Sequence, residues 1–477
     1  MRVKTSWLAP EDERLIFEQA LALLQQVGIG LKGSRALGLL ADRGAEVDQA
    51  TQIVRLPPEL VMSALDLCPR AILMAGATED RDVLLDENQP PHFTTGGCAA
   101  RTLDMRDGKV RPSTLEDLRQ SAALCDELDH VDVFFTTVAA TDVEPERREL
   151  AEYATLLSET SKHHIFVNSP RQAQPLVRIA QVLSGDLTRF RARPRFTTLL
   201  TVASPLQVDG ALLDFHAEMA AIGAPVGIFP SPLCGATAPV TVAGTVTQAL
   251  AEFLGAATAV QSIAPGSRLL MGSIGSVLDM HSAMASFAAP EAVVISAIGA
   301  QVAHSLGLPV QCAGLPTDAK YPGIQAGYEK ALKGLATAMA GADMISGGVG
   351  LLESSSLLYL PQMVIDDEIA AMIQRTLAEV DVSLETVMSE TIQRVGVGGD
   401  FLKEKETVRR LRAGEPFAPL ISTRLSYDAW AATGRTEVDV ARERVEHILA
   451  KRAERELHLS RDQLRELATI CGTGDQG

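Results

Sequence analysis

The sequence lacks the features of membrane and secreted proteins. No apolar stretch runs uninterrupted for about 18 residues, the length of a membrane-spanning helix. Acidic residues close to the start leave no room for the apolar core of a signal peptide. The six cysteines are scattered and form no CxxC pair, which predicts free thiols in a reducing compartment. We therefore expect a cytoplasmic protein without a membrane partner.

The chain also has fewer basic residues than acidic ones. The chain has 43 lysines and arginines against 60 acidic residues, giving a net charge of -17. Binding to nucleic-acid phosphates needs clustered lysine and arginine, so we expect no nucleic-acid partner. A negative charge suits a cationic substrate, although acidity also serves solubility alone.

Motifs for a resident metal or nucleotide are missing as well. The nine histidines lack the spacing of metal ligands, and the neighbours His163 and His164 cannot both face the same way in a strand. There is no GxxxxGK[ST] motif, and the glycines within residues 347–350 do not lead into a helix in the dinucleotide pattern. We expect no metal site and no nucleotide cofactor.

What the sequence does contain is a regular alternation of apolar runs and helical segments. Glycine, proline, asparagine or serine bounds each run, and helical segments such as 114–128 and 290–306 separate them. Eight runs are predicted as strands, at 92–95, 131–136, 164–168, 196–201, 225–229, 268–272, 309–313 and 343–347. Eight strands alternating with helices predict an α/β protein with a (β/α)8 TIM barrel.

Two extensions flank the predicted barrel, which covers residues 91–365. Residues 1–90 are predicted as an N-terminal cap of helices with a short hairpin, and residues 366–477 as a C-terminal helical extension wrapped round the barrel. A further hairpin, with Asp107 and Gly108 at its turn, follows the first barrel strand. We expect this hairpin to lie over the barrel mouth.

Functional residues of a barrel lie in the loops after its strands, and here those loops hold few ionisable residues. The main cluster is Asp318, Lys320 and Tyr321, with Gln325 and Glu329 at the start of the next helix. Asp318 is the candidate catalytic residue because it could anchor a cation or orient a neighbour, with helix or loop capping as the structural alternative. Lys320 could form a Schiff base, although an aldolase lysine usually sits within a strand.

Aromatic side chains offer a second kind of site, since ring faces hold a quaternary ammonium ion. Four of the few aromatic residues lie at or near predicted strand ends: Phe93, Phe229, Tyr321 and Tyr359. Packing in the core or rim is the alternative for each of them. An aromatic cage at the mouth is therefore a hypothesis that four positions support.

Several motifs together resemble the trimethylamine methyltransferase superfamily, the corrinoid-dependent amine methyltransferases. They are Thr95-Gly-Gly, Asp107-Gly with Ser113-Thr-Leu-Glu-Asp, Pro290-Glu, Thr317-Asp-Ala-Lys, Gln325-Ala-Gly-Tyr-Glu-Lys, Ala340-Gly-Ala-Asp and Val364-Ile-Asp-Asp-Glu-Ile. Each is weak alone, but the combination is specific and spans nearly the whole chain. The family's archetype carries pyrrolysine and demethylates trimethylamine. This sequence has no pyrrolysine, so it resembles the branch whose known members demethylate quaternary amines such as glycine betaine.

The resemblance implies a methyltransferase that moves a methyl group from glycine betaine or a related betaine to Co(I) of a corrinoid. The corrinoid (cobalamin) would be carried by a separate partner protein that docks over the barrel mouth, and this chain would bind no cofactor tightly. The leaving group is a neutral tertiary amine, so the displacement needs orientation and a dry pocket rather than a general acid. Loops poor in titratable groups agree with that requirement.

A betaine also has a carboxylate, which backbone N–H groups of Gly347 and Gly348 or the side chain of Asn168 could bind. The expected substrate-binding set is Phe93, Asn168, Phe229, Tyr321, Gln325, Glu329, Gly347, Gly348 and Tyr359. Two alternatives stay open: a Schiff-base lyase or aldolase that uses Lys320, and a non-catalytic betaine-binding homologue. A homo-oligomer is possible because the C-terminal helices offer an interface.

Overall fold

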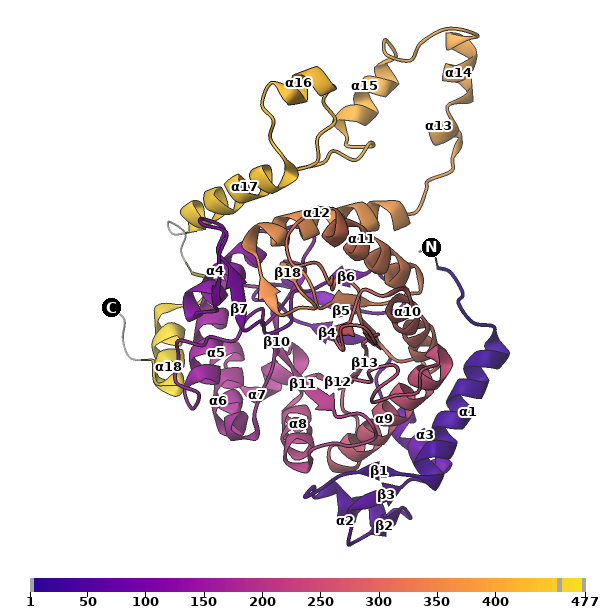
Figure 1. The fold of residues 1–477 in the computed structure, drawn as a ribbon, viewed down its shortest axis with the longest axis vertical. Helices are drawn as coiled ribbons and strands as arrows, with labels where there is room; N and C mark the ends of the chain where they lie inside the picture. Colours follow the sequence, from indigo (N-terminus) through magenta and orange to yellow (C-terminus); the bar gives the residue numbers. More distant parts are fainter. Residues whose placement is uncertain (1–3, 453–456, 474–477) are drawn as a thin grey trace.

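A closed barrel of eight parallel strands forms the centre of the computed structural model, which describes residues 4–452 and 457–473. The strand order is β6-β17-β16-β13-β12-β11-β10-β9, and a bridge between Thr94 and Val133 joins the two edges. The strands are β6 (His92–Phe93), β9 (Val133–Phe135), β10 (His163–Phe166), β11 (Phe196–Val202), β12 (Val226–Pro230), β13 (Leu269–Ser273), β16 (Val310–Ala313) and β17 (Met344–Ser346). The eight predicted strands and the TIM-barrel fold are confirmed (Figure 1).

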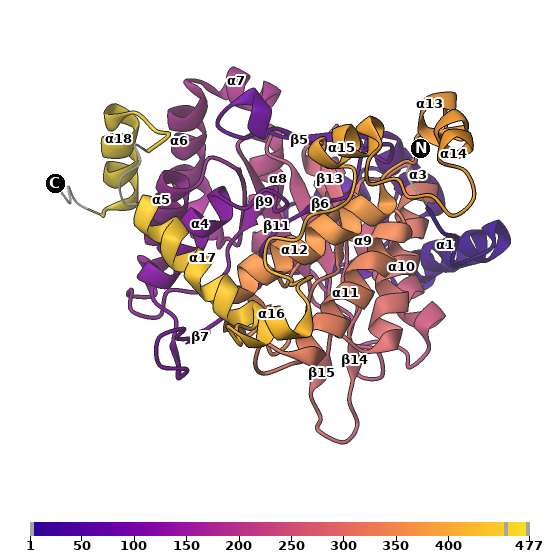
Figure 2. The ribbon, with the colours of Figure 1, turned by 90° about the horizontal axis from the view of Figure 1, so that it is seen from above.

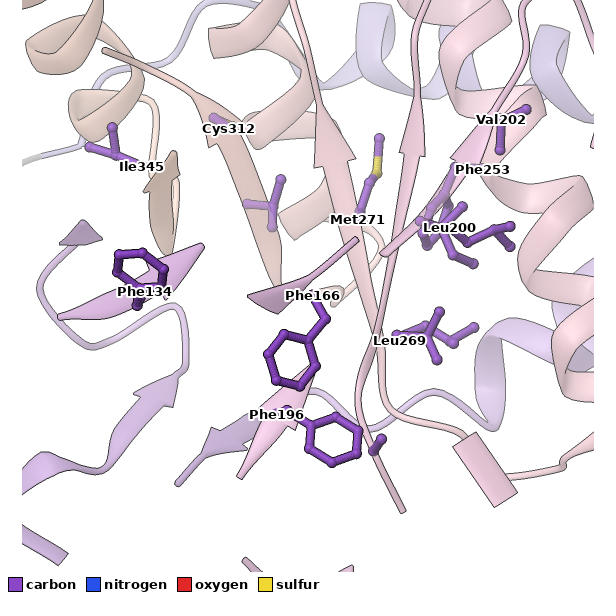
Figure 3. Close-up of a cluster of buried hydrophobic side chains, with 14 of the residues drawn as sticks. Phe134, Phe166, Phe196, Leu200, Val202, Phe253, Leu269, Met271, Cys312 and Ile345 are labelled. Carbon is purple, nitrogen blue, oxygen red and sulfur yellow. The ribbon is translucent and has the colours of Figure 1, made fainter. Parts of the chain in front are cut away.

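Helices surround the barrel in an outer ring (Figure 1). They are α4 (Leu115–Asp126), α5 (Arg148–Glu159), α6 (Ala173–Ser184), α7 (Leu187–Ala192), α8 (Gly210–Ile222), α9 (Val242–Ile263), α10 (Pro290–Ser305), α11 (Ile324–Met339) and α12 (Leu360–Leu377). Alternate strand residues point outward into the layer between strands and helices, and Figure 3 shows Phe134, Phe166 and Phe196 among them. The rings of Phe166 and Phe196 lie 5.4 Å apart, a distance typical of packed aromatic pairs. No helix of the described residues is long and apolar enough to cross a bilayer.

A hairpin that the sequence did not reveal closes the N-terminal end of the barrel. It consists of β4 (Ile72–Met74) and β5 (Val83–Leu85). Its apolar side chains pack against inward-facing residues of the barrel strands, including Val133, Ile165 and Met344. The barrel interior is filled with hydrocarbon at this end, and the cavity inside the barrel lies at the opposite end.

The N-terminal extension lies against α9 and matches the expected helices with a hairpin. Its elements are α1 (Pro10–Gln26), β1 (Ile29–Gly30), α2 (Ala36–Ala41), β2 (Glu46–Asp48), β3 (Ile53–Arg55) and α3 (Pro58–Asp66). Pro10 and Pro58 stand at the first turns of their helices, where a missing N–H costs nothing. The extension thus braces the outside of the barrel.

Two small sheets stand on the mouth side, where the strands end. The predicted hairpin of β7 (Arg101–Leu103) and β8 (Val110–Pro112) forms a four-stranded sheet with β18 (Leu351–Leu352) and β19 (Leu357–Leu358). Another hairpin, β14 (Val277–Leu278) and β15 (Ala285–Ser286), follows β13 and projects at the mouth (Figure 2). Both are loops after barrel strands and surround the opening.

The C-terminal region departs from the expected wrapping. Helices α17 (Glu437–Arg452) and α18 (Arg461–Cys471) do pack on the barrel's outer helices. The preceding elements, α13 (Leu384–Val387), α14 (Ser389–Val395), α15 (Lys405–Arg412) and α16 (Tyr427–Ala431), extend away from the barrel instead (Figure 1). The predicted segments 1–90 and 366–477 also include residues 1–3, 453–456 and 474–477, which lie outside the described residues.

A buried ion pair fixes the loops after β16 and β17. The Nζ of Lys330 lies 2.8 Å from Oδ2 of Asp366, and neither side chain has exposed area. Lys330 also donates to the carbonyls of Leu315 (3.0 Å) and Gly348 (2.6 Å), while Asp366 accepts the N–H of Gly350 (2.8 Å). Burial lowers the pKa of Lys330 and raises the pKa of Asp366, and their mutual attraction opposes both shifts. One charged pair therefore joins two barrel loops.

We expect Asp366→Asn to lower the free energy of unfolding by about 3 kcal/mol or more, because Lys330 keeps a buried charge without its partner. Urea unfolding followed by circular dichroism measures the change. Glu116→Gln is the control, since Glu116 pairs with Arg119 and both are about half exposed. That substitution should cost less than about 1 kcal/mol. Equal losses of unfolding free energy in the two variants would contradict the stabilising role of the buried Lys330–Asp366 pair.

Candidate active site at the barrel mouth

A cavity of about 160 Å³ opens at the C-terminal end of the barrel strands. Its apolar walls are the side chains of Phe135, Leu199, Phe229, Ile274 and Phe287. Small and hydroxyl residues complete the lining: Gly97, Thr201, Ser231, Ala313, Pro316, Ser346, Gly347, Ser354 and Ser355. None of these residues, all within the described part of the chain, is ionisable. TIM-barrel enzymes place their sites at this end.

The Phe229 ring lies across the inside of the barrel because two glycines leave room for it. A Cβ atom at Gly272 would stand 2.5 Å from the ring, and one at Gly227 would stand 2.7 Å from it. Both distances are shorter than any normal contact, so these strand positions require glycine. The ring is nearly buried and forms a rigid wall of the cavity.

Phe287, just after β15, is held in place by side chains from other elements. Its N–H donates to Oδ1 of Asp318 (3.1 Å), and its carbonyl accepts a hydrogen bond from Nζ of Lys333 (2.5 Å). Lys333 is fully buried on α11 and also donates to the carbonyl of Gly275 (3.3 Å). Burial lowers the pKa of Lys333 to about 7, against a smaller opposing effect of the Asp318 charge. Lys333 thus fixes the loop between β13 and α10.

The Asp318 carboxylate joins two walls of the cavity. It accepts hydrogen bonds from the hydroxyl of Ser286 and the N–H of Phe287 on one side. On the other side it accepts from the hydroxyl of Ser354 (2.7 Å). Asp318 is not among the lining residues, and its oxygens point at protein donors. The geometry makes Asp318 a support for the walls rather than a group facing the ligand.

The loop that carries Ser354 has an uncommon backbone. Glu353, Ser354 and Ser355 have φ values of 50°, 52° and 67°, so three successive residues other than glycine adopt the left-handed conformation. Each costs about 1–2 kcal/mol. The N–H groups of Glu353 and Ser354 donate to the carbonyls of Ala319 and Thr317, both at 2.7 Å. Strain of this kind concentrates at functional sites, and here two of the three residues line the cavity.

Gln325 and Glu329 brace the loop between β16 and α11. Glu329 accepts hydrogen bonds from the hydroxyl of Thr317 (2.5 Å) and the N–H of Asp318 (2.8 Å). Gln325 donates to the other carboxylate oxygen of Glu329 (2.8 Å). Neither side chain lines the cavity, so both act on the loop that holds Asp318.

Of the predicted substrate-binding residues, the structure brings Phe229 and Gly347 together at the cavity. Phe93 is fully buried in the core, because its side chain points outward from β6 toward the helices. Asn168 is buried and donates to the hydroxyl of Tyr153. Gly348 packs against the Leu315 carbonyl, where a Cβ atom would stand 2.1 Å from the oxygen.

The other predicted aromatic and basic residues also lie away from the cavity. Tyr321 is 69% exposed, and Tyr359 packs in a small cluster with Leu352 and Leu357. Lys320 is exposed and donates to the carbonyl of Asp318 in its own loop (2.6 Å). The loop between β16 and α11 turns Lys320 and Tyr321 outward, which removes the geometric support for a Schiff base at Lys320.

Sequence reasoning missed most of the lining. Phe135 lies within a predicted strand, and strict alternation from the inward-facing Val133 could have placed it inside the barrel. Phe287, Ser354 and Lys333 carried no local signal, because they meet only through the fold. They come from three separate loops or helices.

A buried amide lies below the cavity. Gln311 pairs in register with Gly272, and it precedes by two residues Ala313, which lines the cavity on the same face of β16. Its side chain is fully buried, and neither polar atom has a hydrogen-bond partner within the described chain. Such groups are rare in folded proteins. The barrel interior thus has a polar group beneath an apolar cavity.

Comparisons with known proteins agree with this architecture. The sequence matches the trimethylamine methyltransferase (MTTB) family over residues 2–469. A trimethylamine methyltransferase of Methanosarcina mazei is 31% identical over 94% of this chain and 91% of that protein. The glycine betaine methyltransferase of Desulfitobacterium hafniense is 27% identical over 94% of this chain and 93% of that protein.

A solved structure shows the same fold. The monomethylamine methyltransferase of Methanosarcina barkeri aligns with a TM-score of 0.51 at 13% identity, covering 92% of this chain and 94% of that one. The family match extends over almost the whole chain, and the relatives that it resembles are named methyltransferases. The chain therefore belongs to the trimethylamine methyltransferase family and is a methyltransferase.

Proposed function

We propose that this protein transfers a methyl group from a small quaternary amine, such as glycine betaine, to the Co(I) of a corrinoid on a separate partner protein. The observation that carries the proposal is the mouth cavity, which three phenylalanine rings and no ionisable side chain line. Ring faces attract a quaternary ammonium ion, which offers no N–H for hydrogen bonding. A relative named a glycine betaine methyltransferase supports this substrate class.

The cavity is large enough for only one of the two reactants. A space of about 160 Å³ suits the head group of a small amine, whereas a corrin macrocycle is far too large for it. The methyl acceptor must therefore approach from outside, over the mouth. When bound there, Co(I) supplies a strong nucleophile for displacement at the methyl carbon.

The chain's own residues have three tasks in this proposal. Phe135, Phe229 and Phe287 hold the cation and exclude water, so that one methyl faces the opening. The hydroxyls of Thr201 and Ser355 and the N–H of Gly347 are the candidate donors for a substrate carboxylate. The other lining hydroxyls already donate to protein acceptors. Asp318 keeps Phe287 and Ser354 in position. The leaving group departs as a neutral tertiary amine, so no residue has to donate a proton.

We expect that the protein converts a reduced Co(I) corrinoid to methyl-Co(III) when glycine betaine, carnitine or proline betaine is added. The visible spectrum of the corrinoid reports the change. Trimethylamine serves as a matched substrate without the fixed charge. Persistence of Co(I) with every quaternary amine, while a known methyltransferase turns over in parallel, would reject the proposal.

We expect Phe229→Leu to raise the KM for the active amine about tenfold or more, because a desolvated cation–π contact contributes about 2 kcal/mol. Steady-state kinetics measures the KM. The control is a neutral analogue with carbon in place of the ammonium nitrogen, whose inhibition constant should change little. If the variant weakened the amine and the neutral analogue equally, the ring would serve only by its shape.

The buried Lys333 predicts a pH dependence of stability. Its pKa is about 7 in the folded protein and near 10.5 when unfolded, so the unfolded chain holds the proton more tightly. The destabilising contribution is complete below pH 7 and decreases as the pH rises toward 10.5. Relative to Lys333→Met, the wild type should gain about 2 kcal/mol of unfolding free energy between about pH 7 and 9.

Urea unfolding at each pH checks this expectation. Lys320→Met is the control, because Lys320 is exposed and should leave the pH dependence unchanged. If the unfolding free energies of the wild type and Lys333→Met changed equally between about pH 7 and 9, Lys333 would be charged in the folded protein at both pH values.

A further inference from the structure

A quaternary ammonium nitrogen carries four substituents that point to the corners of a tetrahedron. Transfer requires one methyl group to face the mouth, from which the acceptor approaches. The other three substituents then point into the cavity, among the rings of Phe135, Phe229 and Phe287. This constraint rests on the proposed function, because it assumes that a methyl group leaves toward the mouth. The chemistry of the inner cavity therefore decides which fourth substituent the site accepts.

The cavity lining, within the described residues, offers no positive charge to a carboxylate on that fourth substituent. Lys330 directs its ammonium group to two backbone carbonyls and to Asp366. Lys333 donates to two backbone carbonyls, and burial lowers its pKa to about 7. Lys320 is exposed and donates to a carbonyl of its own loop. A carboxylate inside the cavity would thus hold a desolvated charge without a cationic partner, which is unfavourable.

Two carboxylates stand behind the cavity walls. Asp318 accepts hydrogen bonds from Phe287 (3.1 Å) and Ser354 (2.7 Å), and both of these residues line the cavity. Glu329 in turn accepts the N–H of Asp318 (2.8 Å). These negative charges attract the ammonium group of a substrate and repel an anionic substituent. The surroundings of the cavity therefore favour a fourth substituent without charge.

Two polar side chains inside the barrel have no hydrogen-bond partner among the described residues. They are the amide of Gln311, at both its nitrogen and its oxygen, and the hydroxyl of Thr94, and both residues are fully buried. Thr94 points inward because its neighbour Phe93 points toward the helices. Gln311 pairs in register with Gly272, over which the Phe229 ring lies. A substituent that passes the edge of this ring comes to the Gln311 amide.

An amide needs both a donor and an acceptor as partners, because its nitrogen donates and its oxygen accepts. An alcohol hydroxyl supplies both functions, whereas a carboxylate only accepts and would repel the amide oxygen. We propose that the preferred substrate is a quaternary ammonium alcohol of the choline type, whose hydroxyl binds to Gln311. Methyl transfer then breaks one bond between nitrogen and methyl carbon, and its electron pair stays on the nitrogen of the departing amino alcohol. The electron pair of the new bond to carbon comes from the acceptor.

Isothermal titration calorimetry of the full chain without a corrinoid tests this selectivity independently of methyl transfer. Choline should bind about tenfold or more tightly than glycine betaine, because the two share a trimethylammonium group and differ in the end group. Equal or tighter binding of glycine betaine would overturn the choline assignment and leave the proposed methyl transfer intact. Choline that binds selectively but never methylates a Co(I) corrinoid would support the assignment and refute methyl transfer. Binding of neither compound would overturn both.

Gln311→Met keeps the length of the side chain and removes its hydrogen-bonding groups. It should weaken choline about fivefold or more and leave tetramethylammonium, which has no hydroxyl, nearly unchanged. Gln261→Met is the matched control, since Gln261 is 1% exposed and its amide donates to a carbonyl on the outside of the barrel. Circular dichroism verifies the folding of each variant. Equal weakening of both ligands by Gln311→Met would show that Gln311 acts only through packing and would overturn its role.

A second variant adds the missing positive charge. Thr201 lines the cavity and is exposed, so Thr201→Lys places an ammonium group there without burying it in the core. It should strengthen the binding of glycine betaine and weaken that of choline, and so reverse the ratio of their dissociation constants. An unchanged ratio would mean that charge does not decide between the two ligands, and it would overturn the electrostatic basis of the choline assignment.

Discussion

Two buried lysines on α11 hold the loops from which the mouth cavity is built. Lys330 satisfies its ammonium group with the Asp366 carboxylate and two backbone carbonyls. Lys333, one turn further, has only carbonyl partners among the described residues, so burial lowers its pKa toward neutrality without a contacting carboxylate to oppose the shift. The apolar walls of the cavity make few polar contacts of their own. Their positions therefore depend on charged groups that stand behind the loops.

The absence of charge inside the cavity fits the direction in which charge moves in the proposed reaction. A quaternary ammonium ion loses its positive charge as the methyl group leaves. A carboxylate beside the nitrogen would stabilise the bound substrate more than the transition state and so raise the barrier. Phenylalanine rings attract the cation more weakly, which limits that loss. The Asp318 carboxylate does not raise the barrier in this way, because it faces Ser286, Phe287 and Ser354 rather than the ligand.

The fold was predictable from the sequence because parallel strands buried on both faces read as continuous apolar runs. The same rule located Phe229 and Gly347 at strand ends, where the barrel forms its site. It could not tell which way loop side chains turn, so Tyr321 was expected at the cavity and is exposed. Nor could it find Lys333 and Phe287, whose contact spans 46 residues and exists only after folding.

The segment between α12 and α17 marks a different limit, because local periodicity indicates helices there while none of the helices α13 to α16 contains a buried residue. Helix α15 combines basic residues in its last turn with no buried residue at all. Helices this short are marginal in water without tertiary contacts.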